Sequence, residues 1–313
     1  MLFGLSCGAI AILMLLGVLL DMRLGEATRW HPLVGFGNLA IRMEKKLNTG
    51  GSRIALGAWA WILVVTPFVV IAWLLTFWLA QFDALFALGV HALLLYFSLG
   101  LRSLRDHTLP IAHALMDGDL AQARLLTARI VSRDTTQAQE AELAKAGVES
   151  LLENGNDAVF STLFWFALGG GPGVVLFRLA NTLDAMWGYR TQRYNEFGRV
   201  AARIDDVLNF IPARLTALSY AVLGNTKQAW QCWRAQAPAW SSPNAGPVMS
   251  AGAGALGISL GGAAIYDGEL EQRPPLGTGP LATGKDIARA WRLVRLTTVL
   301  WLLLICIAGV FYA

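Results

Sequence analysis

Long apolar stretches, separated by polar and basic segments, dominate the pattern of the chain. Residues 1–20, 54–80, 84–101 and 293–313 are almost wholly apolar, and each is long enough to cross the roughly 30 Å hydrocarbon core of a bilayer as a helix. The apolar residues are continuous rather than alternating, which is typical of helices and not of membrane barrels. The pattern predicts an all-α, polytopic membrane protein with about four spans, forming a single membrane-embedded domain over residues 1–313.

The orientation of the spans is predicted from the basic residues between them. A signal peptide is the alternative interpretation of residues 1–20. This stretch has no basic start and no small-residue cleavage motif before Asp21, so we expect an uncleaved span. Lys and Arg cluster in 21–53 and again after Leu101, whereas the connection 81–83 has none. Both basic regions are therefore expected to face the cytoplasm.

The middle of the chain departs from the simple span pattern. Residues 102–158 are polar enough, with helical periodicity, to predict a cytoplasmic helical subdomain. Residues 159–180 are apolar but are broken by the run GGGPG at 169–173, and both of their flanks are basic. These features favour a re-entrant hairpin over a full crossing, which stays the alternative. Residues 265–287 are predicted to be a polar cytoplasmic loop.

Composition supports the membrane class and excludes others. The chain has 313 residues, of which 55% are hydrophobic and only 15% charged, and its net charge is +4. The mean hydropathy is +0.50. Soluble domains carry nearer one quarter charged residues. The dispersed positive charge suits the lipid bilayer or an anionic substrate and predicts no nucleic-acid binding. Three scattered cysteines indicate neither a zinc site nor a disulfide framework.

Acidic residues at helical spacing precede the glycine-rich run. Glu149 and Glu153 are four residues apart, so they share a helix face, and Asp157 follows at the same spacing. Carboxylates beside an apolar surface can hold Mg²⁺, which prefers oxygen ligands. The alternative is a solvated helix face.

Amides, acids and arginines follow the glycine-rich run in unusual density. Arginine forks bind phosphate or carboxylate groups with two hydrogen bonds, and tyrosines add further bonds and stacking. The alternatives are a basic flank set by membrane topology and an ion-pair network between helices. The candidate residues of this region are Arg178, Asn181, Asp184, Tyr189, Arg190, Arg193, Tyr194, Arg199, Arg203, Asp205, Asp206, Asn209 and Arg214.

Further candidates lie outside these two regions. Asp21, Glu26 and His31 follow the first span, and Arg133 belongs to a VSRDT segment that could bind an anion or simply cap a helix. Asn244 lies in a turn, SSPNAG. The sequence contains no HExxH, no GxxxxGK[ST] and no GxSxG motif. A zinc protease, a Walker-type nucleotide loop and a serine-nucleophile elbow are therefore not indicated.

These motifs, in this order, closely resemble the adenosylcobinamide-phosphate synthase family (CobD/CbiB) of cobalamin biosynthesis. The resemblance rests on the segments LLENGNDAVFSTLFW, GGGPG, FRLANTLDAMWGYRTQRYNEFGR, VSRDT and SSPNAG, and spans nearly the whole chain. Two departures are the Glu26-Ala27 dipeptide, where the family usually has Asp-Pro, and Ala158, where it usually has glycine.

The resemblance implies a multi-pass enzyme of the bacterial cytoplasmic (inner) membrane, with its active site facing the cytoplasm. It would be a carbon–nitrogen ligase that joins adenosylcobyric acid to aminopropanol or aminopropanol phosphate, using ATP and Mg²⁺. The alternative functions are a corrinoid transporter and a membrane scaffold for corrinoid enzymes. Homo-oligomerisation and association with other corrinoid-pathway enzymes both stay open.

The resemblance and the residue chemistry together assign roles. Glu153, Asp157, Asp184, His31 and Asp21 are the expected catalytic residues. Glu149, Glu153, Asp205 and Asp206 are the expected metal ligands. The expected substrate- and phosphate-binding residues are Arg133, Arg178, Asn181, Tyr189, Arg190, Arg193, Tyr194, Arg199, Arg203, Asn209, Arg214 and Asn244.

Overall fold

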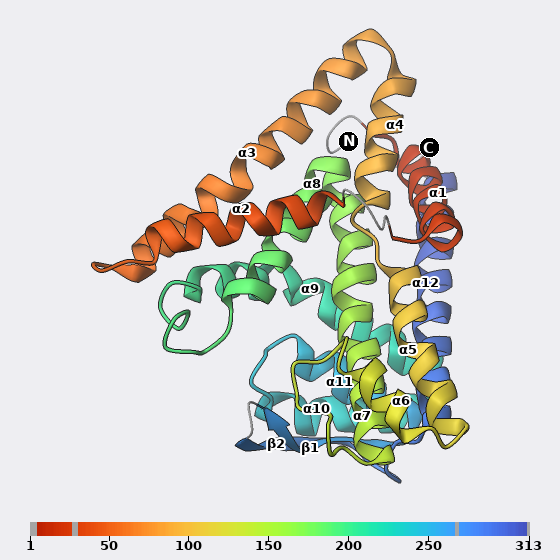
Figure 1. Ribbon diagram of the computed structural model, residues 1–313. Coiled ribbons are helices and arrows are strands. Elements are labelled where there is room, and N and C mark those ends of the chain that lie inside the picture. Colours follow the sequence, from red (N-terminus) through yellow and green to blue (C-terminus); the bar gives the residue numbers. More distant parts are fainter. Residues whose placement is uncertain (1–4, 27–30, 267–268, 312–313) are drawn as a thin grey trace. The chain divides into compact units, whose positions relative to one another are not determined.

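The protein is mainly helical, as predicted, and the part of the chain that the structure describes contains one small sheet (Figure 1). The computed structural model describes residues 5–26, 31–266 and 269–311, so residues 1–4 of the first predicted span lie outside the described part. Its contacts divide the chain into two compact units. Unit 1 comprises Met1–Gly100, Ser161–Asn209 and Leu302–Ala313, and unit 2 comprises Leu101–Phe160 and Phe210–Trp301.

Unit 1 consists of apolar helices. Its elements are α1 Cys7–Leu24, α2 Pro32–Leu47, α3 Arg53–Phe82, α4 Ala84–Tyr96, α8 Ser161–Trp187, the first part of α9 Arg199–Leu223 and the last part of α12 Gly284–Phe311.

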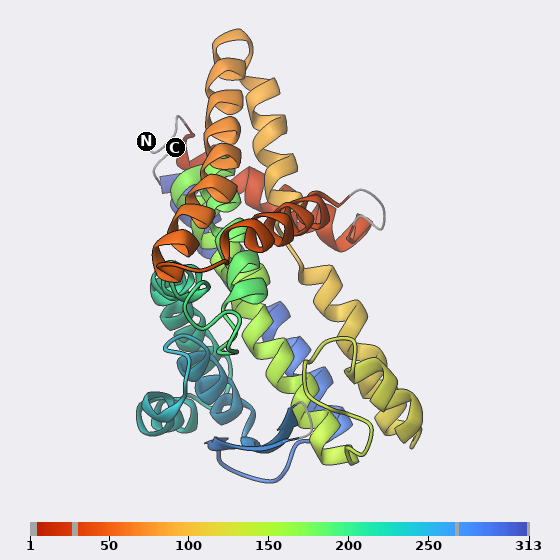
Figure 2. The ribbon, with the colours of Figure 1, turned by 60° about the vertical axis from the view of Figure 1, so that its left-hand side comes forward.

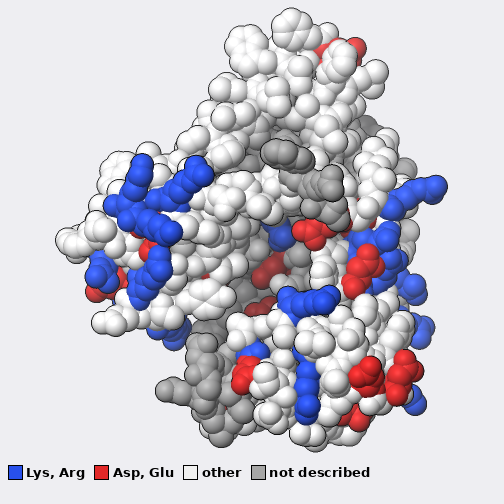
Figure 3. Space-filling view, viewed as in Figure 1, with Lys and Arg blue, Asp and Glu red and all other residues white. Residues whose placement is uncertain are grey.

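Several helical stretches are long and apolar enough to cross a membrane. Among the described residues these are Cys7–Leu24, Arg53–Phe82, Ala84–Met116, Glu140–Trp187 and Gly284–Phe311. They include all four predicted spans and the central segment, whose apolar part begins at Val159. Large apolar side chains such as Trp59, Ile71 and Trp78 are exposed on α3, and the α3–α4 hairpin shows almost no charge on the face seen in Figure 3. Such surfaces are stable in lipid, so the protein is a membrane protein.

The α3–α4 hairpin forms where the sequence predicts it. Helix α3 continues to Phe82, and Asp83 alone separates it from α4. The Asp83 carboxylate accepts the Leu85 N–H at 2.7 Å, which caps the start of α4. Helix α2 begins at Pro32, which occupies its first turn, where a missing N–H has no cost.

Helix α8 reverses direction at Gly170, in agreement with the predicted hairpin. Gly170 has φ 57° and ψ −147°, a conformation that only glycine adopts readily. A Cβ on Gly173 would lie 2.5 Å from the carbonyl oxygen of Trp165, eight residues earlier. In a straight helix these residues would be about 12 Å apart along the axis. The Gly171 N–H, next to this turn, donates to Nδ1 of His91 on α4 at 2.8 Å.

Gly170→Ala is expected to destabilise the protein by about 1–3 kcal/mol. The backbone angles are unfavourable for alanine, and the new Cβ would lie 2.9 Å from Cε1 of His91. Thermal inactivation of the detergent-solubilised protein measures the effect. Gly89→Ala is the matched control, because Gly89 is helical and has nothing within 4 Å of its Cβ position. Equal inactivation of the two variants would contradict the reversal at Gly170.

Unit 2 surrounds α7. Its elements are α5 Leu101–Met116, α6 Leu120–Thr127, α7 Glu140–Gly155, the π-helical turn η2 Asn156–Phe160, the second part of α9, α10 Thr226–Gln236, the 3-10 turn η3 Ala237–Ala239, α11 Ala245–Leu256, the strands β1 Ser259–Tyr266 and β2 Glu269–Gly277, and the first part of α12. The helices predicted for 102–158 are present. Figure 2 shows the green α7 ribbon beside the blue ribbon of α12.

Small residues allow close packing around α7. Every residue of α11, which is rich in Gly and Ala, is buried. A Cβ on Gly252 of α11 would lie 2.7 Å from both Cδ atoms of Leu152 on α7, so only glycine permits this approach. On another side of α7, Gly147 lies against Ile287 of α12.

The prediction of a polar loop over 265–287 is wrong for the first half of this segment, where an antiparallel hairpin forms. Strands β1 and β2 pair from Ser259 with Gly277 to Tyr266 with Glu269, with a bulge between Gly261 and Gly262. Glycine and proline are poor strand formers, so the local residues carry little sign of the hairpin. The hairpin lies against α7 and brings a backbone N–H and an arginine to it.

Candidate functional site

In unit 1, a chain of hydrogen bonds links α8 to α9. The Asp205 carboxylate accepts from Asn181 at 3.3 Å and from Asn209 at 3.0 Å. The side-chain carbonyl oxygen of Asn209 in turn accepts from the Ser161 hydroxyl at 2.6 Å. Asp205, Asn209 and Ser161 are buried. The predicted residues Asn181, Asp205 and Asn209 therefore do lie together, and both oxygens of Asp205 already accept N–H groups.

Asp206 lies beside this chain in a looser environment. Its Oδ2 is 3.8 Å from Nη1 of Arg203, whose side chain is exposed. Burial raises the pKa of Asp206, and the charges of Arg203 and Arg190 oppose this shift. An ion pair that is long and exposed to water contributes little stability.

His31 caps α2, and its geometry restricts its chemistry. Its Nδ1 accepts the Leu33 N–H at 3.3 Å, and its ring packs edge-on against Phe97. Burial lowers the pKa of His31, Glu26 opposes this shift and Arg178 reinforces it. The ring is therefore neutral at pH 7, and with Nδ1 accepting we assign its proton to Nε2. In this state His31 is a hydrogen-bond donor rather than a base.

The opening of the chain contributes a buried acid near His31 in the sequence. Asp21 lies in the last turn of α1 and is only 2% exposed. The Gly25 N–H closes this turn on the Asp21 carbonyl oxygen, and the Tyr96 hydroxyl donates to the Gly25 carbonyl at 2.8 Å. The end of α1 is thereby attached to the end of α4. Residues 27–30, between these groups and His31, lie outside the described residues.

Arg193 attaches the 188–198 loop to α2. Its guanidinium donates to the buried Glu44 carboxylate at 3.0 and 2.6 Å, which holds the pKa of Glu44 below its usual value. Asn48 donates both to Glu44 and to the Arg193 carbonyl oxygen. Arg193, a predicted phosphate ligand, is thus paired with a carboxylate in this structure.

The other predicted residues of this region are more accessible. Tyr189, Arg190, Arg199 and Arg203 are exposed, while Arg178, Asp184 and Tyr194 are half-buried. Basic side chains gather at the left-hand edge of Figure 3, where α2 and the 188–198 loop lie in Figure 1. Asp184 points at Gly188, where a Cβ would lie 2.1 Å from its Oδ1. Only glycine fits there.

In unit 2, the buried Glu149 carboxylate holds two arginines. Arg133 donates to Oε2 at 2.5 Å, and Arg273 of β2 donates to Oε2 at 3.1 Å and to Oε1 at 3.2 Å. The Gly261 N–H, aimed by the β-bulge, adds a bond to Oε1 at 2.8 Å. Burial alone would raise the pKa of Glu149, but the two arginines outweigh it and the pKa is lowered. Glu149 is therefore bonded as an ion-pair partner, although it is a predicted metal ligand.

Sequence reasoning missed Arg273. It lies 124 residues from Glu149, in a segment predicted to be a loop. In the sequence it is simply an arginine in a polar stretch, and this pattern does not indicate a distant partner.

Glu153, one turn further along α7, is in the opposite situation. No ion pair or hydrogen bond of Glu153 is present among the described residues. Burial, then the neighbouring carboxylates of Asp157 and Glu149, raise its pKa to about 7. It lies outside the apolar part of the α7–α8 stretch, which begins at Val159. Glu153 and Asp157 thus form an acid pair on consecutive helical turns.

Asp157 is held by the π-helical turn and its neighbours. The Asn156 amide donates to Asp157 at 2.9 Å, and its side-chain carbonyl oxygen accepts from Thr216 at 2.9 Å. The Tyr220 hydroxyl donates to the Leu152 carbonyl oxygen at 3.2 Å, and burial, together with Asp157, raises the pKa of Tyr220. π-Helical turns often occur at functional sites. Asn156, Thr216 and Tyr220 were not among the predicted residues.

Arg214 and Asn244 bind each other. Arg214 donates to the side-chain carbonyl oxygen of Asn244 at 2.7 Å and to the Pro243 carbonyl at 2.9 Å, and its guanidinium lies 3.7 Å from the Phe210 ring centroid. The predicted turn at SSPNAG is confirmed, and Arg214 fixes it to α9.

The acid pair fits Mg²⁺ better than the other predicted ligands do. Mg²⁺ is usually bound through one or two carboxylates, with waters and substrate phosphates completing its shell. Glu153 and Asp157 offer oxygen donors that repel each other, whereas Glu149 and Asp205 already accept nitrogen donors through both oxygens. Within the described residues, no group of three or more His, Cys, Asp or Glu is placed to hold a metal.

The predicted site residues are divided between the units. Unit 1 contains Asp21, His31, Arg178, Asn181, Asp184, Tyr189, Arg190, Arg193, Tyr194, Arg199, Arg203, Asp205, Asp206 and Asn209. Unit 2 contains Arg133, Glu149, Glu153, Asp157, Arg214 and Asn244.

Comparison with known proteins identifies relatives over nearly the whole chain. The family model described as CobD/Cbib protein matches residues 14–294. A cobalamin biosynthesis protein CobD of Stutzerimonas stutzeri is 54% identical, covering 95% of this chain and 97% of its own. Proteins of the same name from Chromobacterium violaceum and Rhodobacter capsulatus are 52% and 37% identical, covering 93% and 91% of this chain and 94% and 93% of their own. No solved structure matches.

Proposed function

Because the chain belongs to the CobD/CbiB family of cobalamin biosynthesis, we propose that it is an amide-forming ligase. The proposed reaction joins the carboxylate of adenosylcobyric acid to the amine of aminopropanol or aminopropanol phosphate, which yields adenosylcobinamide or its phosphate. It takes place at the cytoplasmic membrane, on the side that faces the cell interior.

The observation that carries the proposal is the acid pair formed by Glu153 of α7 and Asp157 of η2. An alkylammonium must lose one proton before its nitrogen can attack the acyl carbon, and the nitrogen loses a second as the amide forms. A general base is most effective when its pKa is near the working pH. Glu153, with its pKa raised to about 7, meets this requirement, whereas Glu149 is neutralised by two arginines.

The proposed roles of the other residues follow from their contacts. ATP would phosphorylate the carboxylate with release of ADP, and the amine would then displace phosphate from the acyl carbon. Mg²⁺ would neutralise phosphate charge. Asp157, oriented by Asn156, would hold the metal ion, and Glu153 would act as the base. The exposed arginines 190, 199 and 203 would bind phosphate or corrinoid carboxamide groups. His31, with its proton on Nε2, would donate a hydrogen bond, so the proton acceptor is assigned to a carboxylate.

Product formation by the isolated protein tests the function. Purified protein in detergent or vesicles is incubated with adenosylcobyric acid, ATP, Mg²⁺ and either amine, and the corrinoid product is identified by mass spectrometry. We expect adenosylcobinamide or its phosphate, with ATP consumption that requires both substrates. Asp184→Asn is expected to slow turnover at least tenfold, because the substitution removes a charge from the α8 face that carries Arg178 and Asn181.

The same assay separates the alternative functions. A transporter would accumulate corrinoid in vesicles without forming product, and a scaffold would form product only when soluble enzymes are added. Either result, from protein that is folded and membrane-inserted, would contradict the ligase proposal.

A further inference from the structure

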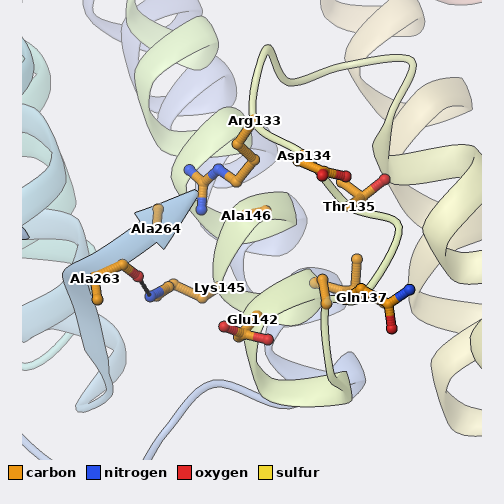
Figure 4. A pocket seen from close by; sticks show the side chains of 11 residues that line it. Arg133, Asp134, Thr135, Gln137, Glu142, Lys145, Ala146, Ala263 and Ala264 are labelled. Atoms are coloured by element: carbon orange, nitrogen blue, oxygen red, sulfur yellow. Dashed lines mark hydrogen bonds between the residues drawn. The ribbon is translucent and has the colours of Figure 1, made fainter. Parts of the chain in front are cut away.

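A small pocket lies beside the Glu149 cluster in unit 2 (Figure 4). It is enclosed by the 133–138 loop, by α7 and by Ala263 and Ala264 of β1, and its volume is about 90 Å³. A water molecule needs about 10–15 Å³ on this measure. The pocket therefore has room for several waters or for one tetrahedral oxyanion.

Two cationic side chains form the inner wall of the pocket. In Figure 4 the guanidinium of Arg133 and the ammonium of Lys145 both extend toward β1. Lys145 is half-buried and donates to the Ala263 carbonyl oxygen at 3.0 Å. Among the described residues this is its one hydrogen bond, although an ammonium group has three donors. Lys145 therefore has donor capacity that the protein does not use.

The acids near the pocket do not neutralise all of the cations around it. Glu149 shares its single charge between Arg133 and Arg273. The Asp134 carboxylate is exposed and accepts from Thr136, while that of Glu142 is exposed and accepts the Gln139 N–H. Water screens these two exposed charges more than the half-buried cations. Burial lowers the pKa of Lys145, Glu149 opposes the shift, and Arg273 and Arg133 reinforce it, as expected for a cation among cations.

We propose that this pocket binds a phosphate group, with Lys145 and Arg133 as its ligands. The inference rests on the proposed ligase function, because that function supplies two phosphate sources: ATP and the phosphorylated amine. Both present a terminal phosphate with the same charge and geometry. Lys145 is a ligand that the sequence did not indicate.

Chemical labelling of Lys145 in the intact wild-type protein tests the pocket directly. Lysine acylation at pH 7.5 is followed by mass spectrometry, with exposed Lys285 of α12 as the internal control. Inorganic phosphate, ATP with Mg²⁺, and aminopropanol phosphate are added separately. At least one should slow the labelling of Lys145 fivefold or more without affecting Lys285. The compound that protects at the lowest concentration identifies the source. Equal labelling with and without all three would overturn the proposal.

Variants give a second, equilibrium measurement. Lys145→Ala should weaken binding of the protecting phosphate compound by about tenfold or more, the typical loss of one charge-assisted hydrogen bond. Lys145→Arg should retain most of the affinity, and Lys285→Ala should be unchanged. An unchanged affinity of Lys145→Ala would overturn the proposal.

Neither measurement requires turnover, so the two proposals can fail separately. Protection of Lys145 without amide formation would refute the ligase function and leave the phosphate pocket in place. Amide formation without protection of Lys145 would refute the phosphate pocket and leave the ligase function in place.

Discussion

Glu153→Gln is expected to reduce amide formation by about 100-fold or more, the usual contribution of a positioned general base. Glutamine keeps the shape of the side chain but cannot accept a proton. Turnover of adenosylcobyric acid, measured by product mass, gives the rate. In the wild type, the rate should rise with pH up to about pH 7, because Glu153 must be ionised to act.

The same substitution is expected to stabilise the protein at neutral and alkaline pH. The pKa of Glu153 is about 7 in the folded protein and near 4.5 in the unfolded chain. The folded state therefore binds the proton more tightly, and stability falls as pH rises from about 4.5 to about 7. At 1.36 kcal/mol per pKa unit, the loss is roughly 3 kcal/mol. A neutral glutamine at this position would not suffer the loss, so the variant should resist heat better at pH 8.

Glu140→Gln is the matched control for this prediction. It makes the same chemical change on the same helix, at an exposed position of the first turn. We expect almost unchanged turnover and little change in heat resistance. Normal turnover of Glu153→Gln would show that another group accepts the proton. A lower heat resistance at pH 8 would show that Glu153 is stabilised by a partner in the folded protein.

Glu149→Gln is expected to destabilise unit 2 by about 3–5 kcal/mol, the usual cost of leaving one side of a buried ion pair without its partner. Arg133 and Arg273, whose side chains are only 11% and 10% exposed, would lose the carboxylate that neutralises them. The hairpin would also lose the charge that accepts the Gly261 N–H. Faster proteolysis within 259–277 and a lower inactivation temperature would measure the effect.

This prediction also separates two roles of Glu149. If Glu149 binds Mg²⁺, Glu149→Gln should raise the Mg²⁺ concentration needed for turnover while stability without metal stays normal. The ion-pair role instead predicts destabilisation in the absence of metal. The double variant Glu149→Gln/Arg273→Gln should be more stable than Glu149→Gln alone, since fewer buried charges are left unpaired. Failure of this rescue would contradict the ion-pair role.

The helical part of the fold was predictable because its signals are local. Apolar stretches of span length identified α1, α3, α4 and α12, and the broken run around Gly170 identified the reversal in α8. The β-hairpin was not predictable, because Gly261, Gly262 and two prolines argue against strands. Its pairing depends on contacts with α7 that local sequence does not reveal.

The sequence predicted which residue types contribute to the candidate site better than it predicted which of these residues pair with each other. The spacing of the acids predicted that Glu149 and Glu153 share a helix. It did not predict that, among the described residues, Glu149 is paired with arginines and Glu153 is not. That difference comes from Arg273, a distant residue that reaches Glu149 and not Glu153. Arg193 and Glu44 are 149 residues apart, so their pairing was equally inaccessible to motif reasoning.

The bond between His91 and Gly171 has a consequence for biogenesis. A polar N–H at the tip of an apolar loop would resist entry into lipid by itself, since nothing there could accept it. His91 is synthesised eighty residues earlier, so α4 can already be in the bilayer when the glycine-rich segment leaves the ribosome. The order of the chain thus favours insertion of the α3–α4 hairpin first, as a template onto which the later segment folds.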